Sequence, residues 1–486
     1  MPIFMIQQIK DLEASARLLE PTARVRNKVR QKTITYTEKF INNLPSANAY
    51  NTSPDNGIAL LNSPISQQPI AIDEAINLIK ENIDTPGLNP ASGKNFGYIP
   101  GGGIYYSSLA DYIAAISNRY AGVFFASPGA VRMENMLINW LASLAGYPAT
   151  ASGNLASGGS IANLTAIVTA RETHQLKARN FHNTVVYLSQ HTHHCIEKSL
   201  RVAGLGECIK KYIPLDSQHR IIPKALEEII LQDIAQGLCP WLIVASAGTT
   251  DIGSVDPLDA IGDIAQKHKL WFHIDGAYGA FFLLTKAGKE KLKGIEKSDS
   301  LVMDPHKSLF LPYGTGVVLV KNKQHLQAAH SYQANYMQDT LIATEETSPA
   351  DLSPELTKHF RGLRMWLPLK LLGLKPFQAA LEEKLLLANY FYQQLKKIKG
   401  FELGPEPELS VVTYRYVPQK GDVNAFNKAL VNAIQQEGTI FISSTTINGQ
   451  FILRLAVLSF RTHLKEINLT LKLLKKHATL LEKQQN

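Results

Sequence analysis

The sequence predicts an α/β fold: a mostly parallel β-sheet with helices on both faces, followed by a small α+β domain at the C-terminal end. Three observations predict it. From about residue 100, short apolar segments alternate with helical ones, which is typical of βαβ units. After residue 375 the pattern changes to a long helix followed by further strands. The chain of 486 residues, 45% of them hydrophobic, is long enough for a large core and a second domain.

Residues 1–95 form the first predicted region, a helical arm. Two amphipathic helical patterns, IQQIKDLEASARLLE and EAINLIKENI, are separated by the polar stretch SANAYNTSPDNG. We expect this arm to pack on another surface, such as that of a partner subunit.

Residues 96–375 form the predicted large domain. Its helical segments include IEKSLRVAG, IPKALEEIILQDIA and PLDAIGDIAQKH, which separate apolar segments along the chain. The predicted strands are TVVYLS (184–189), CIKKYIP (208–214), WLIVASA (241–247), LWFHID (270–275), SLVMD (300–304) and GVVLV (316–320).

Residues 376–486 form the predicted small domain. The long helix FQAALEEKLLLANYFYQQLKKI leads to three strand-like segments, with a further helix after the first of them. These segments, SVVTYRYV, TIFISSTTING and FILRLAVL, predict an antiparallel sheet.

Charge and cysteine content exclude several classes of protein. The net charge is +9, but basic and acidic residues are mixed and no basic stripe is interleaved with aromatics, so we expect no nucleic-acid partner. The cysteines, Cys195, Cys208 and Cys239, form no CxxC pair, which disfavours disulfides and zinc. No apolar signal segment or membrane-length stretch occurs, so we expect a cytoplasmic protein without membrane contact.

A glycine-rich turn, ASGGS, opens a helical segment near residue 159. Glycines let a ligand approach the backbone, and the free amides at a helix N-terminus favour an anion such as a phosphate. Gly159 and Ser160 are therefore candidate phosphate-binding residues. The alternative is that the serine only caps the helix after a tight turn.

Three histidines and a cysteine lie close together in LSQHTHHCIEKSL, residues 188–200. A metal site would need a complete first shell, and no cysteine or carboxylate cluster elsewhere in the sequence completes one. We therefore predict no metal. A histidine at the mouth of a sheet can instead stack its ring on a flat cofactor.

An acid and an amine follow two successive strands. Asp275 ends LWFHID, and Lys307 follows SLVMD one βαβ step later, at the edge where open α/β sheets bind their ligands. A turn-capping role for Asp275 and a solvated position for Lys307 are the alternatives. With the phosphate cradle beside them, the pair predicts pyridoxal 5′-phosphate: the amine forms the Schiff base, the acid binds the ring nitrogen and the turn binds the phosphate.

Four segments, DPHKSLFLPYGTG, HIDGAYGAFF, ASAGTTDIGSVDPL and ASGGSIANL, resemble those of the pyridoxal-phosphate-dependent group II amino-acid decarboxylases, such as the aromatic-L-amino-acid and glutamate decarboxylases. The resemblance runs from about residue 90 to the C-terminus. It implies a fold-type-I homodimer with a seven-stranded central sheet and active sites at the subunit interface. It also implies decarboxylation of an L-amino acid to the amine and CO2.

By matching positions, the resemblance implies a role for each candidate residue. Lys307 would carry the cofactor as its internal aldimine, and Asp275 would hold the pyridine nitrogen. Ala277 would lie against the ring and His193 would stack on its opposite face. The residues that would bind the phosphate or surround the lysine are Gly159, Ser160, Thr249 and His306.

The sequence departs from the family at a loop where many members carry a tyrosine that protonates Cα. The corresponding place, near Pro349, has no tyrosine. The proton would have to come from another residue: Tyr332 or Tyr336 upstream, or else His193 or Lys307. Without prompt protonation, oxygen could trap the carbanion, so an aldehyde synthase is an alternative, as are an aminotransferase and a carbon–carbon lyase. A non-catalytic scaffold that binds an acidic partner is a further hypothesis.

Aromatic residues suggest the substrate. In the family, the segment that here reads NFGYIPGGGIYYSSLADY contributes to the side-chain pocket, and its aromatics favour an aromatic or apolar substrate, although they could equally be core. Arg361 and Arg364 precede a tryptophan and could receive a carboxylate, with a surface position as the alternative for Arg364. The aromatic candidates are Tyr98, Tyr105, Tyr106 and Phe124.

Overall fold

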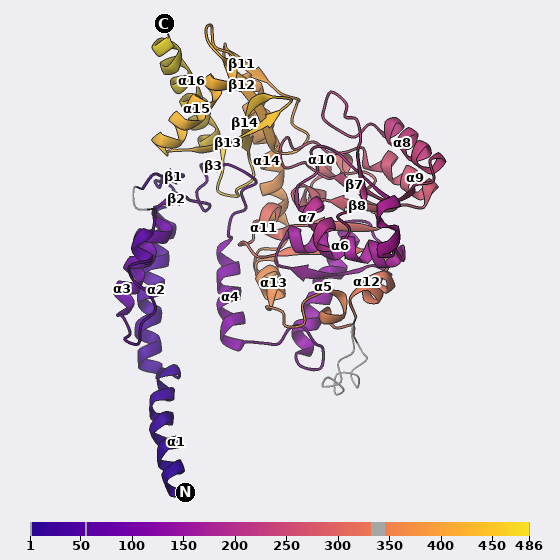
Figure 1. The fold of residues 1–486 in the computed structure, drawn as a ribbon. Helices are drawn as coiled ribbons and strands as arrows, with labels where there is room; N and C mark the ends of the chain where they lie inside the picture. Colours follow the sequence, from indigo (N-terminus) through magenta and orange to yellow (C-terminus); the bar gives the residue numbers. More distant parts are fainter. Residues whose placement is uncertain (1, 54–55, 332–345, 486) are drawn as a thin grey trace.

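The structure, a computed structural model, describes residues 2–53, 56–331 and 346–485. Figure 1 shows three regions: N-terminal helices that extend away from the rest, a large body built around a β-sheet, and a smaller C-terminal sheet with helices against it.

A seven-stranded sheet forms the centre of the large region, in the order β4-β10-β9-β8-β7-β5-β6. Neighbouring strands pair in parallel, except that β10 is antiparallel to β4 and to β9. The predicted mostly parallel seven-stranded sheet is therefore confirmed. Its strands are β4 (Ser152–Ala156), β5 (Thr184–Leu188), β6 (Ile209–Tyr212), β7 (Cys239–Ser246), β8 (Trp271–Asp275), β9 (Ser300–Met303) and β10 (Gly316–Val320).

Helices cover both faces of this sheet because its strands carry large apolar side chains at successive positions, which point to opposite faces. In β8, for example, Phe272 and Ile274 join the core on one face, whereas Trp271 joins the core on the other. Full burial of each such aliphatic or phenylalanine side chain stabilises the fold by about 1.5–3 kcal/mol. The first face is covered by α5 (Pro128–Leu144), α8 (Pro223–Ala235) and α9 (Leu258–His268), and the second by α6 (Gly159–Thr173), α7 (Cys195–Val202) and α12 (Lys323–His330).

Further helices complete the large region. Ala110 and Ala114 of one of them, α4, pack against Leu363 of another, α13. These helices are α4 (Tyr105–Ser117), α10 (Lys286–Lys291), α11 (Pro305–Ser308) and α13 (Arg361–Leu372).

The small C-terminal region contains a five-stranded sheet in the order β11-β12-β14-β13-β3. The three predicted strands, β12, β13 and β14, are antiparallel as expected, and β11, which was not predicted, joins them antiparallel. The strand β3 pairs with β13 in parallel and comes from the predicted boundary between arm and large domain. This stretch therefore belongs to the small sheet. The elements are β3 (Asn95–Phe96), β11 (Phe401–Leu403), β12 (Val411–Tyr416), β13 (Phe441–Ile447), β14 (Gln450–Ala456), α14 (Lys375–Leu395), α15 (Val423–Glu437) and α16 (Leu464–Gln485).

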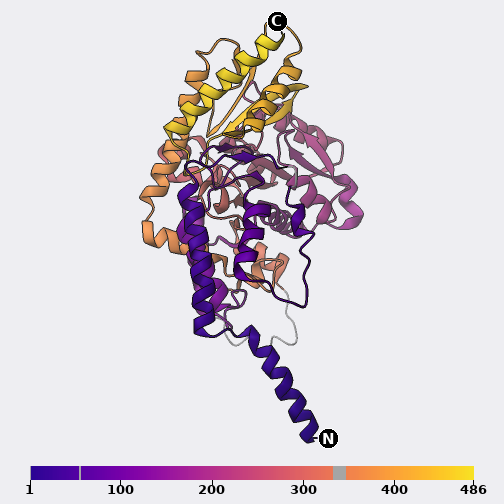
Figure 2. The same ribbon diagram turned by 90° about the vertical axis from the view of Figure 1, so that its left-hand side faces the viewer.

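The N-terminal arm extends from the body, and its first helix points away from it in both views (Figures 1 and 2). Apolar side chains of this helix face solvent, with Ile3 85% and Phe4 79% exposed. None of the described helices has the length and apolarity needed to cross a lipid bilayer. The arm contains α1 (Pro2–Ala16), α2 (Ala23–Asn43), β1 (Tyr50–Asn51), α3 (Ile72–Ile79) and β2 (Gly87–Leu88).

Candidate active site

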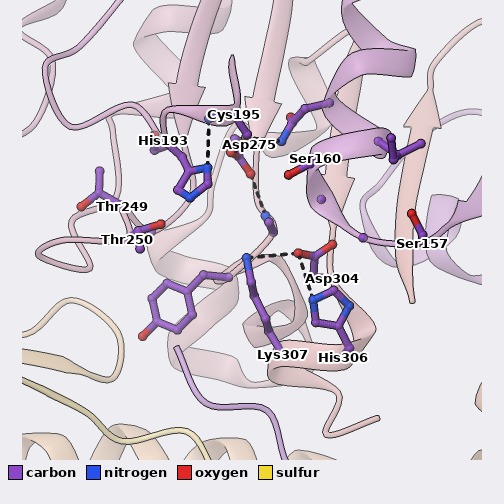
Figure 3. A pocket seen from close by; sticks show the side chains of 18 of the residues that line it. Ser157, Ser160, His193, Cys195, Thr249, Thr250, Asp275, Asp304, His306 and Lys307 are labelled. Atoms are coloured by element: carbon purple, nitrogen blue, oxygen red, sulfur yellow. Dashed lines mark hydrogen bonds and ion pairs between the residues drawn. The ribbon is translucent and has the colours of Figure 1, made fainter. Parts of the chain in front are cut away.

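A cavity of about 310 Å³ lies at the carboxyl ends of β8 and β9, beside the N-terminus of α6. This is the edge at which open α/β sheets bind their ligands. All the candidate cofactor and catalytic residues line this one cavity, and Figure 3 shows most of them. They are Gly159, Ser160, His193, Thr249, Asp275, Ala277, His306 and Lys307.

Lys307 lies on α11, the short helix that follows β9. Figure 3 shows its side chain pointing toward Asp304, and its Nζ lies 3.1 Å from Oδ2 of that residue. Burial alone would lower the pKa of Lys307, but Asp304 and Asp275 together raise it above the ordinary value. Lys307 is therefore an ammonium ion at neutral pH and becomes a nucleophile only after it loses a proton.

Asp304 is a site residue that sequence reasoning missed. Its side chain is buried, and its Oδ1 has no hydrogen-bond partner among the described residues. The ring of His306 approaches the same oxygen as Lys307, with Nε2 3.6 Å from Oδ2. A signal was present in the sequence, because Asp304 follows β9 just as Asp275 ends β8.

Asp275 is the last residue of β8 and is 9% exposed. Its Oδ1 accepts a hydrogen bond from the backbone N–H of Ala277 at 3.1 Å, and its Oδ2 accepts one from Nδ2 of Asn163 at 3.3 Å. Within the described ranges, no basic side chain forms an ion pair with it. A buried carboxylate held only by neutral donors is suited to a cationic ligand, such as a protonated ring nitrogen.

His193 lies in the loop between β5 and α7. Its Nδ1 accepts a hydrogen bond from the backbone N–H of Cys195 at 3.3 Å, which places the proton of the neutral ring on Nε2. Burial lowers the pKa of His193, against the raising effect of Asp275, so the ring is neutral at neutral pH. A flat, neutral imidazole beside Asp275 and Lys307 can cover one face of a planar ring.

The turn between β4 and α6 has free backbone amides that could bind an anion, and it is called the cradle below. The first amides of α6 have no partner within the helix and point, with the positive end of the helix dipole, toward the cavity. A Cβ on Gly159 would lie 2.8 Å from Oδ2 of Asp304, so glycine gives Asp304 room beside the turn. Thr249, across the cavity, accepts a hydrogen bond at Oγ1 from the backbone N–H of Ser254 at 3.2 Å.

His306 lies on α11, directly before Lys307. Its Nδ1 lies 2.6 Å from the carbonyl oxygen of Thr315 and 3.2 Å from the backbone nitrogen of the same residue, so the tautomer decides which of the two bonds forms. Burial lowers the pKa of His306, against the raising effect of Asp304. Its other ring nitrogen, Nε2, faces the carboxylate of Asp304.

The predicted substrate-side residues lie outside this cavity in a single chain. Phe124 is buried beneath the guanidinium of Arg132, whereas Tyr98 and Tyr105 are exposed. Arg361 already pairs with Glu355 at 3.2 Å. The alternative of a surface position for Arg364 is wrong, because its side chain is only 13% exposed and its Nε lies 2.8 Å from Oδ1 of Asp111. The remaining candidate, Tyr106, is half-buried on α4.

The place of the missing tyrosine is defined by Pro349, which is buried in a short 3₁₀ helix, Pro349–Leu352. The upstream candidates Tyr332 and Tyr336 lie outside the described residues. In the part of the chain that the structure describes, no group of His, Cys, Asp and Glu side chains could hold a metal ion.

The residues present fit pyridoxal 5′-phosphate. The cavity combines an amine on Lys307, an unpaired buried acid at Asp275, and glycine-rich helix amides for a phosphate. These features match the three functional groups of that molecule.

Comparisons with known proteins agree with this fit. Residues 54–417 match the pyridoxal-dependent decarboxylase conserved domain. Aromatic-L-amino-acid decarboxylase from Bacillus atrophaeus is 36% identical over 376 residues, which span 76% of this chain and 78% of that protein. Phenylacetaldehyde synthase from Arabidopsis thaliana is 26% identical, over 87% of this chain and 89% of that protein.

The solved structures include that of Oryza sativa TDC with PLP and tryptamine. It superposes with a TM-score of 0.89 over 95% of this chain and 99% of that chain, at 23% sequence identity. The fold, the matched domain and the cavity residues point to the same class of enzyme. The chain therefore belongs to the pyridoxal-dependent decarboxylases, which remove CO2 from amino acids with the help of pyridoxal 5′-phosphate.

Proposed function

We propose that this enzyme decarboxylates an aromatic L-amino acid to the corresponding amine. The observation that carries the proposal is the meeting of Lys307, Asp275 and His193 around one cavity. The preference for an aromatic substrate is supported by the relative from Bacillus atrophaeus, whose name gives this activity. The reaction releases CO2 and consumes one proton, which replaces the carboxylate on Cα.

Each of the three residues has a separate task. Bound pyridoxal 5′-phosphate supplies an aldehyde that bonds to amines and a ring that accepts the electron pair left when CO2 departs. Lys307 provides the amine that holds the cofactor before the substrate takes its place. Asp275 stabilises the positive charge on the ring nitrogen, because an opposite charge favours the protonated form. His193 covers the ring and excludes water from that face.

The returning proton needs a donor near Cα. His193 carries its proton on Nε2, and Lys307 holds an ammonium proton once it is free of the cofactor, so either side chain can supply it. Lys307 is favoured because its pKa is raised, so it regains its proton at neutral pH, whereas burial keeps the imidazole from doing so.

An aldehyde synthase is the second candidate function. Two observations favour it: the stretch around Pro349 has no tyrosine, and phenylacetaldehyde synthase is among the relatives. In that reaction, O2 and water are consumed and the products are the aldehyde, CO2, ammonia and hydrogen peroxide. No specific observation favours an aminotransferase or a carbon–carbon lyase.

A homodimer with cofactor sites near the subunit interface accompanies the proposed activity. The exposed apolar side chains of α1 support it, since such a surface is stable in water when a second chain covers it.

Product analysis tests these functions. The purified enzyme, loaded with cofactor, is incubated separately with each standard L-amino acid, and CO2, amine, aldehyde and peroxide are measured. We expect equal amounts of CO2 and amine from an aromatic amino acid, no peroxide, and no reaction by Lys307→Ala. Aldehyde with peroxide and O2 consumption would select the second function, and release of amine only from an acidic amino acid would refute the aromatic preference.

A further inference from the structure

A chain of buried hydrogen bonds leads to the Oδ2 atom of Asp275 from the opposite end of its own strand. Trp271, His273 and Asp275 alternate along β8, so their side chains lie on one face of the sheet. Ser300 of β9 is the register partner of His273, and Asn163 comes from α6, which covers this face. The four residues other than Asp275 are at most 3% exposed.

Four contacts connect these side chains without a gap. The Nε1 of Trp271 lies 2.8 Å from Oγ of Ser300, which in turn lies 2.8 Å from Nδ1 of His273. The Nε2 of His273 lies 2.7 Å from Oδ1 of Asn163, and Nδ2 of Asn163 lies 3.3 Å from Oδ2 of Asp275.

The chemistry of the groups fixes the direction of every bond. A carboxylate only accepts, so the amide NH₂ of Asn163 donates to Asp275 and its carbonyl faces His273. Burial lowers the pKa of His273 to about 4, so the ring is neutral and its Nε2 holds the proton that Asn163 accepts. Its Nδ1 must then accept from Ser300, and Ser300 must accept from Trp271, whose indole N–H can only donate.

The chain of bonds therefore cannot reverse. If Oδ2 of Asp275 carried a proton, that O–H would face the NH₂ of Asn163, so that two donors would meet. If the amide of Asn163 rotated to avoid this, its NH₂ would face the N–H of His273, and two donors would meet there instead. The indole at the far end cannot accept a hydrogen bond, so it does not compensate. We propose that Asn163, His273 and Ser300 are positioning residues that hold Asp275 as an oriented, ionised carboxylate, through a one-way hydrogen-bond relay from Trp271.

The other titratable groups near Asp275 do not replace this relay. Lys307 and the Asp275 carboxylate interact, but the ammonium of Lys307 is paired with Asp304 and is removed when the lysine binds the cofactor. Cys195 is kept as a neutral thiol because burial raises its pKa, and His193 is neutral because burial lowers its pKa. The relay at Oδ2 and the backbone N–H of Ala277 at Oδ1 are therefore the permanent sources of stabilisation for the negative charge at Asp275.

The inference rests on the proposed role of Asp275 toward the ring nitrogen. A non-covalent cofactor analogue tests the relay and this role of Asp275 together. 4′-Deoxypyridoxine 5′-phosphate lacks the aldehyde, so Lys307 cannot react with it. With ¹⁵N in its ring, NMR reports the pH at which the bound ring nitrogen loses its proton. We expect Asn163→Leu to lower this pH by about one unit. Ser300 does not line the cavity, and we expect Ser300→Ala to lower this pH by a smaller amount.

Two variants serve as controls. Ser298→Ala removes another fully buried hydroxyl, which contacts Tyr147 at 2.6 Å and has no connection to Asp275. It should leave the transition of the ring nitrogen where the wild-type protein has it. His273→Gln keeps an acceptor for Ser300 and a donor for Asn163, so it should retain most of the wild-type behaviour, whereas His273→Leu should not.

The outcomes separate the relay from the proposed function. If Asn163→Leu and Ser300→Ala bind the analogue with an unchanged ring-nitrogen transition, the relay is refuted while the role of Asp275 stands. If Asp275→Asn also leaves the transition unchanged, the role of Asp275 is refuted, and the relay with it. In the cofactor-free protein, ¹⁵N-histidine spectra should show His273 neutral with its proton on Nε2, and a proton on Nδ1 would overturn the relay directly.

Discussion

Lys307 differs from a surface lysine because of the charges around it. Burial disfavours its ammonium form, but Asp304 and Asp275 outweigh burial and raise its pKa. Since only the neutral amine attacks an aldehyde, we expect Asp304 to slow the proposed first reaction of the lysine with pyridoxal 5′-phosphate. Asp304 thus keeps the ammonium ion stable in a buried site at the expense of its reactivity.

We expect Asp304→Asn to speed the reaction of Lys307 with pyridoxal about tenfold near neutral pH. Loss of a carboxylate in contact lowers the pKa of an amine by about one unit or more, which raises the fraction of neutral amine tenfold. Pyridoxal lacks the phosphate, so its rate, followed by stopped-flow absorbance with the cofactor-free protein, reports on the amine alone. The rate should also reach its plateau at a lower pH in the variant.

The matched control for this prediction is Asp263→Asn, which removes an exposed carboxylate that pairs with Lys297 on the surface. Its rate should equal that of the wild-type protein. A rate in Asp304→Asn that is unchanged, or lower at every pH, would contradict the assigned effect of Asp304 on Lys307.

At the scale of the elements, the proposed phosphate cradle depends on close contact between β10 and the turn that precedes α6. A Cβ on Gly316, the first residue of β10, would lie 2.5 Å from the carbonyl carbon of Gly158. The carbonyl carbon is a backbone atom, and the added Cβ is bonded directly to the backbone, so neither can rotate away. Gly316→Ala must therefore displace the turn. We expect affinity for 4′-deoxypyridoxine 5′-phosphate to fall at least tenfold, about 1.4 kcal/mol, in a fluorescence titration. Gly129→Ala, where a Cβ meets nothing within 4 Å, should bind as the wild-type protein does, and equal binding by both variants would contradict the argument.

A buried ion pair connects the segment after residue 346 to α5, which in turn contacts β4, the strand before the cradle. The Nζ of Lys358 lies 2.8 Å from Oε1 of Glu134 on α5, and this oxygen also accepts the backbone N–H of Leu155 in β4. Both side chains are at most 3% exposed. Lys358 therefore neutralises a carboxylate that itself holds β4.

We expect Lys358→Met to lower the stability of the fold by about 3–5 kcal/mol, because it leaves the charge of Glu134 buried without a cation. Thermal unfolding of the cofactor-free protein should show a clearly lower transition temperature. Lys224→Met removes a lysine that is 87% exposed and lies 3.9 Å from Glu228, so its transition temperature should not change measurably. A similar transition temperature in the two variants would mean that the buried pair contributes no more than a surface pair.

Local sequence predicted six strands of the large sheet, and most of them are largely apolar runs, as burial on both faces requires. The edge strand β6, IKKY, instead alternates half-buried and exposed residues. β4 escaped this reasoning because SGNLA contains one large apolar residue, Leu155, and three small or polar ones that suit a turn. Its place in the sheet comes from pairing with β10, from Gly316 opposite Ala156 to Val320 opposite Ser152. Pairing partners so far apart in the chain leave no local signal.

The candidate site shows the same division. Lys307 and Asp275 were predictable because each follows an apolar strand, where a charged residue is unusual unless it meets a ligand. Asp304 and Asn163 were not predicted, since their importance comes from contacts with residues in other elements. The polar positions of β8, at His273 and Asp275 within WFHID, were the one local sign of the relay, because a buried strand has little reason to alternate polar residues on one face.

At the scale of the whole molecule, α1 exposes an apolar surface that a single chain does not cover. On α1, Ile3, Phe4, Ile6, Ile9 and Leu12 are each more than 50% exposed, and the helix stands away from the body (Figure 2). Aliphatic side chains in such a position stabilise an assembly by about 1.5–3 kcal/mol each when a partner buries them. In the proposed homodimer, the second copy supplies this cover.

We therefore expect the double variant Ile9→Ser and Leu12→Ser to weaken self-association at least a hundredfold. Two buried side chains per arm, each contributing about 1.5 kcal/mol or more, account for at least about 3 kcal/mol of association free energy. Sedimentation velocity over a concentration series measures the change as a shift from dimer to monomer. Lys10→Ser, on the same exposed helix, tests whether any substitution in α1 has this effect, and it should leave the dimer intact. A wild-type protein that sediments as a monomer would refute the homodimer, whereas a double variant that dimerises as tightly as wild type would show that the arm lies outside the interface.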